Sequence, residues 1–307
     1  FLVFIIIFIY LTVKKENIKI YFFPILFSVF LVPFLVILFW PYLWDDPIKN
    51  IILSFTELAN FGHRTFNLYF GELVSSTNIR WHYYLVWFLI TTPTFVLFFF
   101  TIGFILLLTQ IIKEFMKLDE SNDDLWKNEN QMFNFYLITT LIVIVVGTIK
   151  FDESQYGALR HLYFLYPIVI TLALLGFQFV NKFLENIKLK IVLFFVIGVN
   201  LLYIFHWNYK YHPHQQVYFN YVSKYYAQKN FDLDYWGLSN LHSLKYILKN
   251  NSNFPLTVGT ISFSDLTVST LMLDKTSKKN ILLSGNLSDA DFLITNYKKR
   301  IRKNFII

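Results

Sequence analysis

An arginine and a histidine stand side by side where a short polar loop (150–160) runs into a strongly apolar segment. They are Arg160 and His161, within the stretch Gln155–Pro167. An ionisable group at the edge of a membrane helix is costly without a partner, so such groups are functional candidates. Arginine keeps its charge and offers a rigid fork of donors that suits a phosphate. The pair predicts a site for a phosphate or anionic headgroup. The alternative is that Arg160 reaches lipid headgroups while His161 bonds a backbone carbonyl.

Other ionisable side chains are expected to line the same cavity. Asp152 and Tyr156 lie in the same loop as the arginine, and His82 stands at the mouth of another apolar segment. Asp45 and Asp46 form a paired carboxylate that suits metal binding or activation of a hydroxyl. Helix capping is a sufficient alternative explanation for Asp46.

Two groups in the C-terminal part have residue types that suit ligand binding. Asp234 and Trp236 belong to a polar, aromatic loop, in which the indole is expected to stack on a sugar or to pack against membrane helices. His212 and His214 have the chemistry of metal ligands, but no third ligand follows at a fixed spacing. We therefore predict no metal site there.

The composition is that of an integral membrane protein. The 307 residues are 55% hydrophobic, 21% aromatic and 15% charged, where a soluble domain carries roughly 25% charged residues. The absence of cysteine excludes disulfides, thiol catalysis and cysteine-bound metal within these residues. No nucleic-acid partner is predicted.

The charge is unevenly distributed. Residues 1–208 hold 14 Lys/Arg and 14 Asp/Glu, whereas residues 209–307 hold 13 and 6, so the whole net charge of +7 lies in the second part. These cations either face anionic lipid headgroups or form a solvated surface.

A span of about 20 apolar residues crosses a membrane as a helix. Six segments qualify, the first as the truncated end of a helix: 1–13, 18–40, 83–112, 132–149, 161–180 and 191–207. Lysine-rich turns at 12–19 and 181–190 predict a cytoplasmic side. The loops 41–82 and 150–160 and the C-terminal part then lie outside.

The fold class follows from this pattern. We predict an α-helical polytopic membrane protein with about six membrane helices (1–208) and a small extracytoplasmic α/β domain (209–307). An amphipathic helix is expected to begin at Pro47, with Asp46 as its N-cap. In the C-terminal part we expect helices at 215–229 and 239–249, and strands at 256–263, 267–273, 281–284 and 291–295.

A series of motifs resembles one known family. In order, they are Trp40–Pro47, Trp81–Tyr84 with Thr91–Pro93, Tyr156–His161, His212–Pro213 with Val217–Asn220, Asp234–Gly237, and Ile294–Tyr297. Together they resemble the C-terminal part of bacterial multispanning glycosyltransferases similar to the dolichyl-phosphate-mannose protein mannosyltransferases, which have the GT-C fold and are family 39-like. Leu159 departs from the family pattern, which has a small aromatic residue or glycine before the arginine.

The resemblance implies inverting transfer of a sugar from a polyprenyl-phosphate donor to a glycan, lipid or protein acceptor, outside the bacterial inner membrane. It implies that Arg160 pairs with the donor phosphate and that His161 supports it. It also implies that the catalytic carboxylate lies upstream of Phe1, so we expect these residues alone to be inactive. No cofactor is expected besides the co-substrate, and the need for a divalent metal stays open.

Two functions from other classes remain as alternatives. A transporter or flippase of a lipid-linked or anionic solute would use the same arginine as a binding charge without an upstream carboxylate. A non-catalytic membrane subunit would also lack that carboxylate.

Overall fold

The computed structural model describes residues 19–59, 65–121, 128–150, 155–261 and 264–295. Contacts divide these residues into two compact units. The first contains described residues up to 59 together with 117–121 and 128–150. The second contains 65–116, 155–261 and 264–295, and it carries every predicted site residue that the structure describes except Asp45.

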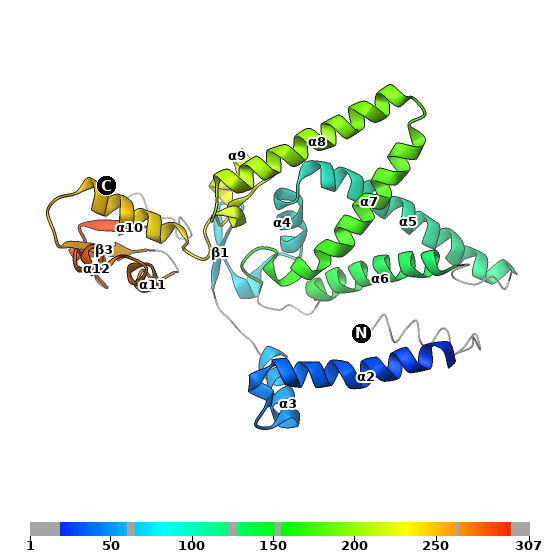
Figure 1. Ribbon diagram of the computed structural model, residues 1–307, viewed down its shortest axis with the longest axis horizontal. Coiled ribbons are helices and arrows are strands. Elements are labelled where there is room, and N and C mark those ends of the chain that lie inside the picture. The colour runs from blue at the N-terminus through cyan, green and yellow to red at the C-terminus, as the bar shows by residue number, and fades with distance from the viewer. Residues whose placement is uncertain (1–18, 60–64, 122–127, 151–154, 262–263, 296–307) are drawn as a thin grey trace. The chain divides into compact units, whose positions relative to one another are not determined.

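Within the described residues, four helical segments are long and apolar enough to cross a membrane: Thr94–Met116, Glu129–Lys150, Arg160–Phe183 and Ile187–Lys210. They correspond to most of α5 (Thr94–Ser121), to α6 (Glu129–Lys150), to a 3-10 turn (Arg160–Leu165) followed by α7 (Tyr166–Phe183), and to α8 (Ile187–Lys210) (Figure 1). The chain is therefore a membrane protein with a mostly helical fold. The predicted segment 1–13 lies outside the described residues.

The first unit begins with α2 (Lys19–Phe39), within the predicted apolar segment 18–40. The amphipathic helix predicted at Pro47 is present as α3 (Pro47–Ala59). Asp46 caps it as expected, since the Asp46 carboxylate accepts the Lys49 N–H at 3.1 Å. Exposed Ile48, Ile52 and Phe55 give α3 an apolar face.

The single span predicted at 83–112 is wrong, because the chain forms two helices there. The first, α4 (Tyr83–Thr91), ends at Thr92, whose ψ of 135° is extended, and α5 begins after Pro93. Proline disfavours a helical residue before it and provides no N–H donor. The Asn220 side chain donates to the carbonyls of Leu89 (2.6 Å) and Thr92 (2.9 Å). These bonds satisfy backbone groups at the break.

Helices α5 and α7 cross at two glycines (Figure 1). A Cβ added to Gly103 of α5 would lie 1.9 Å from the Leu172 carbonyl oxygen, and one added to Gly176 of α7 would lie 2.0 Å from the Phe99 oxygen. Small residues of this kind let two membrane helices bring their backbones together. The crossing fixes α7, whose beginning follows the Arg160 turn.

The sequence analysis missed a β-hairpin between residues 66 and 75. Strands β1 (Phe66–Tyr69) and β2 (Glu72–Ser75) pair antiparallel, with Tyr69 opposite Glu72. Both turn residues, Phe70 and Gly71, have positive φ (52° and 80°). This is the conformation of a tight two-residue hairpin turn, in which a glycine is common and a phenylalanine is rare.

The C-terminal part contains a small α/β region with its own core. Three parallel strands lie in the order β4-β3-β5: β4 (Ile281–Leu283), β3 (Leu256–Thr260) and β5 (Phe292–Ile294). Helices α10 (Ser239–Asn250), α11 (Thr267–Leu271) and α12 (Lys275–Lys279) belong to this region (Figure 1). Its buried core consists of Leu244, Ile247, Leu256, Val258, Leu266, Leu273, Ile281 and Ile294.

Two predictions about this part are wrong. The strand expected at 267–273 is helix α11, because the Asp265 carboxylate accepts the Thr267 N–H at 3.1 Å and favours a helical turn. The helix expected at 215–229 is a 3-10 turn (Gln215–Val217), an irregular segment (218–223) that ends in a turn, and then α9 (Lys224–Asn230). Asn220 in that segment is bonded to the α4–α5 break, so tertiary contacts override local helix propensity.

The predicted domain boundary after residue 208 stays a prediction. Residues just beyond it bond to the hairpin and α4: the Asn220 N–H donates to the Ile90 carbonyl (2.8 Å), and the Asp232 carboxylate accepts the Leu68 N–H (3.1 Å).

Candidate functional site

The segment that leads into the Arg160 turn is held by two hydrogen bonds from its backbone N–H groups. The Gln155 N–H donates to the Ser76 carbonyl at 3.0 Å. The Ala158 N–H donates to the hydroxyl of Tyr83, a fully buried side chain, at 3.2 Å. Gly157 and Ala158 both have positive φ, 69° and 58°. Such a conformation is unusual for alanine, and residues held in it cluster at functional sites.

The Arg160 guanidinium lies among three aromatic rings. Its central carbon lies 4.3 Å from the centre of the Tyr156 ring, 5.4 Å from Tyr235 and 5.2 Å from Trp236. A cation within about 6 Å of an aromatic ring is attracted by the negative ring face. Two of these rings come from the segment between α9 and α10, which is distant in sequence. Among the described residues, aromatic rings and an imidazole orient this cation, and no carboxylate does so.

Gly157 is required for this placement. A Cβ at Gly157 would lie 3.0 Å from Cδ and 3.1 Å from Nε of Arg160. Those atoms are the stem of the same guanidinium, so a larger residue at 157 would displace it. The positive φ at 157 independently favours glycine.

His161 and Arg160 act as a pair, as the sequence indicated. The Arg160 Nε–H donates to His161 Nε2 at 3.1 Å, and the His161 ring meets the Tyr156 ring edge-on at 5.2 Å between centroids. This bond uses Nε2 as the acceptor and therefore assigns the ring proton of neutral His161 to Nδ1. The remaining guanidinium donors are the two terminal NH₂ groups, which are those that bind an oxyanion in a bidentate manner.

The surroundings of the cation favour an anionic ligand. Among the described residues, the contacts of Arg160 are rings and an imidazole, and none is a carboxylate. Burial raises the pKa of Tyr235, although Arg160 partly lowers it. The phenol therefore stays protonated at neutral pH and can donate a hydrogen bond to the same anion.

Asp234 and Trp236, which were predicted to contact a sugar together, differ in burial and in their contacts. Asp234 is buried, and its carboxylate accepts the backbone N–H groups of Leu238 (3.1 Å) and Ser239 (2.7 Å), which stabilises the start of α10. Trp236 is exposed and lies against Arg160. A sugar contact by either residue stays a prediction.

Among the other predicted cavity residues, His82 contacts the hairpin. The His82 Nδ1 atom lies 2.6 Å from the Tyr69 hydroxyl, and the His82 ring contacts Phe70. Asp45 belongs to the other compact unit. Asp152 lies outside the described residues. Tyr156 is the one member of this group that the structure brings to the arginine.

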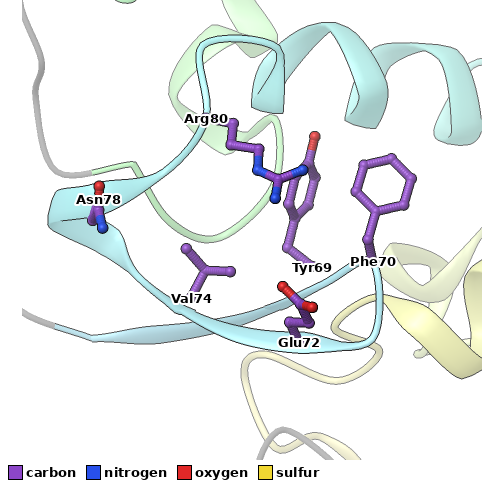
Figure 2. Close-up of a pocket in the computed structure, with 6 residues that line it drawn as sticks. All are labelled: Tyr69, Phe70, Glu72, Val74, Asn78 and Arg80. Atoms are coloured by element: carbon purple, nitrogen blue, oxygen red, sulfur yellow. The ribbon is translucent and has the colours of Figure 1, made fainter.

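A second polar, aromatic cluster lies on the hairpin. Figure 2 shows an open pocket lined by Tyr69, Phe70, Glu72, Val74, Asn78 and Arg80. This cluster was not predicted from the sequence, because the hairpin that gathers these side chains was not predicted.

No metal centre is visible in the described part of the chain, where no three histidine, cysteine, aspartate or glutamate side chains cluster suitably. The Nε2 atom of His214 lies 3.3 Å from Nδ1 of His242, and His212 Nδ1 lies 2.8 Å from Gln215 Nε2.

Two site residues were missed in the sequence. Tyr235 adjoins Trp236, but only the fold shows that it reaches Arg160. Tyr83 belongs to the Trp81–Tyr84 motif, but only the fold shows that it is buried and accepts the Ala158 N–H.

Comparison of the chain with models of known protein families, with curated proteins and with solved structures finds no match.

Proposed function

We propose that this chain forms the donor-binding part of a glycosyltransferase that uses a polyprenyl-phosphate sugar. The observation that supports the proposal is the Arg160 guanidinium, which three aromatic rings orient and which contacts no carboxylate among the described residues. A lipid phosphate at the end of a membrane helix is the complementary charge.

The chemistry of transfer agrees with this placement. Departure of the lipid phosphate from the sugar develops negative charge on the leaving oxygen. A preorganised cation in a partly water-excluded site stabilises such charge more than it would in water. Arg160 is the binding group in this proposal, and His161 positions it through the bond to Nε.

The proposal includes the topology. About six membrane helices, with the loops 41–82 and 150–160 and the C-terminal α/β region outside the bacterial inner membrane, would put Arg160 on the outer side. An acceptor glycan, lipid or protein would approach from that side. The proposal assigns no general base among the described residues.

Binding can be tested with the 307-residue chain in lipid nanodiscs. Undecaprenyl phosphate should quench Trp236 fluorescence, measured as the difference from Trp236→Phe, and undecaprenol, which lacks the phosphate, should not. Arg160→Gln should weaken binding about 10-fold or more, because a hydrogen bond to a charged group contributes about 1.5–3 kcal/mol. Lys182→Gln, at the opposite end of α7, is the matched control and should bind normally. Equal binding of both lipids would contradict the proposal.

Transfer is tested with the full-length gene product and an undecaprenyl-phosphate-linked radioactive sugar. Arg160→Gln should abolish transfer to membrane acceptors while leaving the amount of folded protein unchanged. Phosphate-dependent binding without any transfer by the unmodified protein would instead indicate a lipid carrier or a non-catalytic subunit.

A further inference from the structure

The hairpin pocket has a defined architecture. Because side chains alternate along a strand and Tyr69 pairs with Glu72, the side chains of Tyr69, Glu72 and Val74 share one face of the hairpin. Asn78 and Arg80, from the connection to α4, border the same space. Figure 2 shows the side chains of Arg80 and Glu72 directed into it.

The pocket carries two opposite charges that remain available. Arg80 and Glu72 are both exposed, and neither forms an ion pair with a described residue. The bottom of the pocket is neutral and polar. Burial raises the pKa of Tyr69 to about 12, against a smaller lowering by Arg80, so its hydroxyl stays protonated beside His82 Nδ1.

Phe70 supplies an apolar wall in a preset orientation. Its φ of 52° is rare for a non-glycine residue and places the ring at the tip of the hairpin. The ring packs on Tyr69 (4.7 Å) and Phe231 (5.2 Å), yet 41% of the side chain remains exposed. The tip is held in place because the Gly71 N–H donates to the Asn230 carbonyl at 2.9 Å.

These features limit the chemistry of a ligand. A hydrocarbon would leave Arg80 and Glu72 without hydrogen-bond partners on desolvation, which is costly. A simple cation would be repelled by Arg80, and a dense polyanion would be repelled by Glu72. A ligand with hydroxyl donors, an apolar ring face and one anionic group satisfies all three kinds of side chain.

We propose that the hairpin pocket binds an acidic sugar unit, as part of the acceptor. The apolar face of the sugar would stack on Phe70, its hydroxyls would bond Glu72 and Asn78, and its carboxylate or phosphate would pair with Arg80. The acceptor role rests on the proposed function, whereas the binding of an acidic sugar does not.

The test uses saturation-transfer NMR on the 307-residue chain in nanodiscs, with glucuronic acid, glucose 6-phosphate and glucose as probes. One or both acidic sugars should bind about 10-fold or more tightly than glucose, since a charged hydrogen bond contributes about 1.5–3 kcal/mol. The pair of acids shows whether a carboxylate or a phosphate is preferred. Saturation transfer to none of the three, or equal transfer to glucose, would overturn the proposal.

Variants locate the binding. Arg80→Gln should remove the preference for the acidic sugars over glucose. Phe70→Leu should weaken the binding of all three sugars severalfold. Phe66→Leu is the matched control: Phe66 is also exposed (55%) but lies on β1 outside the pocket. Circular dichroism checks that each variant is folded. An equal effect of Phe66→Leu and Phe70→Leu would contradict the assignment.

The two proposals fail separately. Arg160→Gln should leave binding of the acidic sugar unchanged, and Arg80→Gln should leave binding of undecaprenyl phosphate unchanged. Loss of phosphate-lipid binding with retained sugar binding would refute the donor site alone. The reverse result would refute the pocket alone.

Discussion

Helices α7 and α8 belong to apolar segments of equal length but differ in packing. With its preceding 3-10 turn, α7 gives an apolar segment of 24 residues, and α8 gives another of 24 residues. Yet α7 buries Val169, Leu172, Ala173 and Gly176, whereas α8 has no buried residue in the described structure. Apolar composition therefore predicts that a segment can cross a membrane, but not what it packs against.

Of these two helices, the packed one, α7, is the one that adjoins the candidate site. Arg160 lies in the turn that leads into α7, and the crossing with α5 fixes that helix. The same region contains the α4–α5 break and its bonds from Asn220. Glycine, asparagine and tyrosine occur both here and on α8, so the same substitution can be compared in the two environments.

The largest effect is expected at the crossing glycines. Gly176→Ala should destabilise the protein by about 2 kcal/mol or more, because its Cβ would overlap the Phe99 carbonyl and overpacking costs about 1–3 kcal/mol or more. Gly198→Ala in α8 meets no atom within 4 Å and should be neutral or stabilising by up to about 1 kcal/mol. Unfolding in mixed micelles of dodecyl maltoside and sodium dodecyl sulfate measures both.

Gly103→Ala tests the same contact from α5 and should resemble Gly176→Ala, since its Cβ would overlap the Leu172 carbonyl. If Gly176→Ala and Gly198→Ala change the free energy of unfolding equally, the backbones of α5 and α7 do not meet at these glycines.

Much of the fold could be predicted from the sequence because the signals were local. Long apolar runs located most of the spans, and Asp46-Pro47 located the start of α3. The break at Pro93 was not predicted, and the carbonyls beside it are bonded by Asn220, which lies more than a hundred residues later. The Phe70 turn was missed because phenylalanine is rarely found at positive φ.

The candidate site was predictable only in part, because some of its residues are adjacent in sequence and others are far apart. Arg160 and His161 are adjacent, so their pairing followed from the sequence. The rings of Tyr235 and Trp236 reach the guanidinium across about 75 residues of chain, which no periodicity encodes. Asp234 has a carboxylate suited to ligand binding, but its hydrogen bonds hold the start of α10.

A second prediction compares two asparagines. Asn220 is 2% exposed and bonds the carbonyls of Leu89 and of the fully buried Thr92, so Asn220→Ala should cost about 1–3 kcal/mol by removing the donor from these acceptors. Asn200 on α8 is outside the core, and among the described residues its side chain bonds the carbonyl one turn earlier in its own helix. Asn200→Ala should change stability by less than about 0.5 kcal/mol. Similar losses in the same micelle titration would show that the α4–α5 break does not depend on Asn220.

The smallest effect concerns two tyrosines and appears on raising the pH. The pKa of Tyr69 is raised by burial from 10 to about 12 in the folded protein, so an unfolded chain ionises this phenol first. Its contribution to stability is complete below pH 10 and is lost as the pH rises toward 12. By pH 10.5 the loss should be about 1 kcal/mol. Tyr69→Phe should reduce this decline, whereas Tyr209→Phe, at an 80% exposed position of α8, should keep it. Thermal unfolding between pH 8 and 10.5 measures both slopes, and equal slopes would mean that Tyr69 ionises as readily in the folded protein as in the unfolded chain.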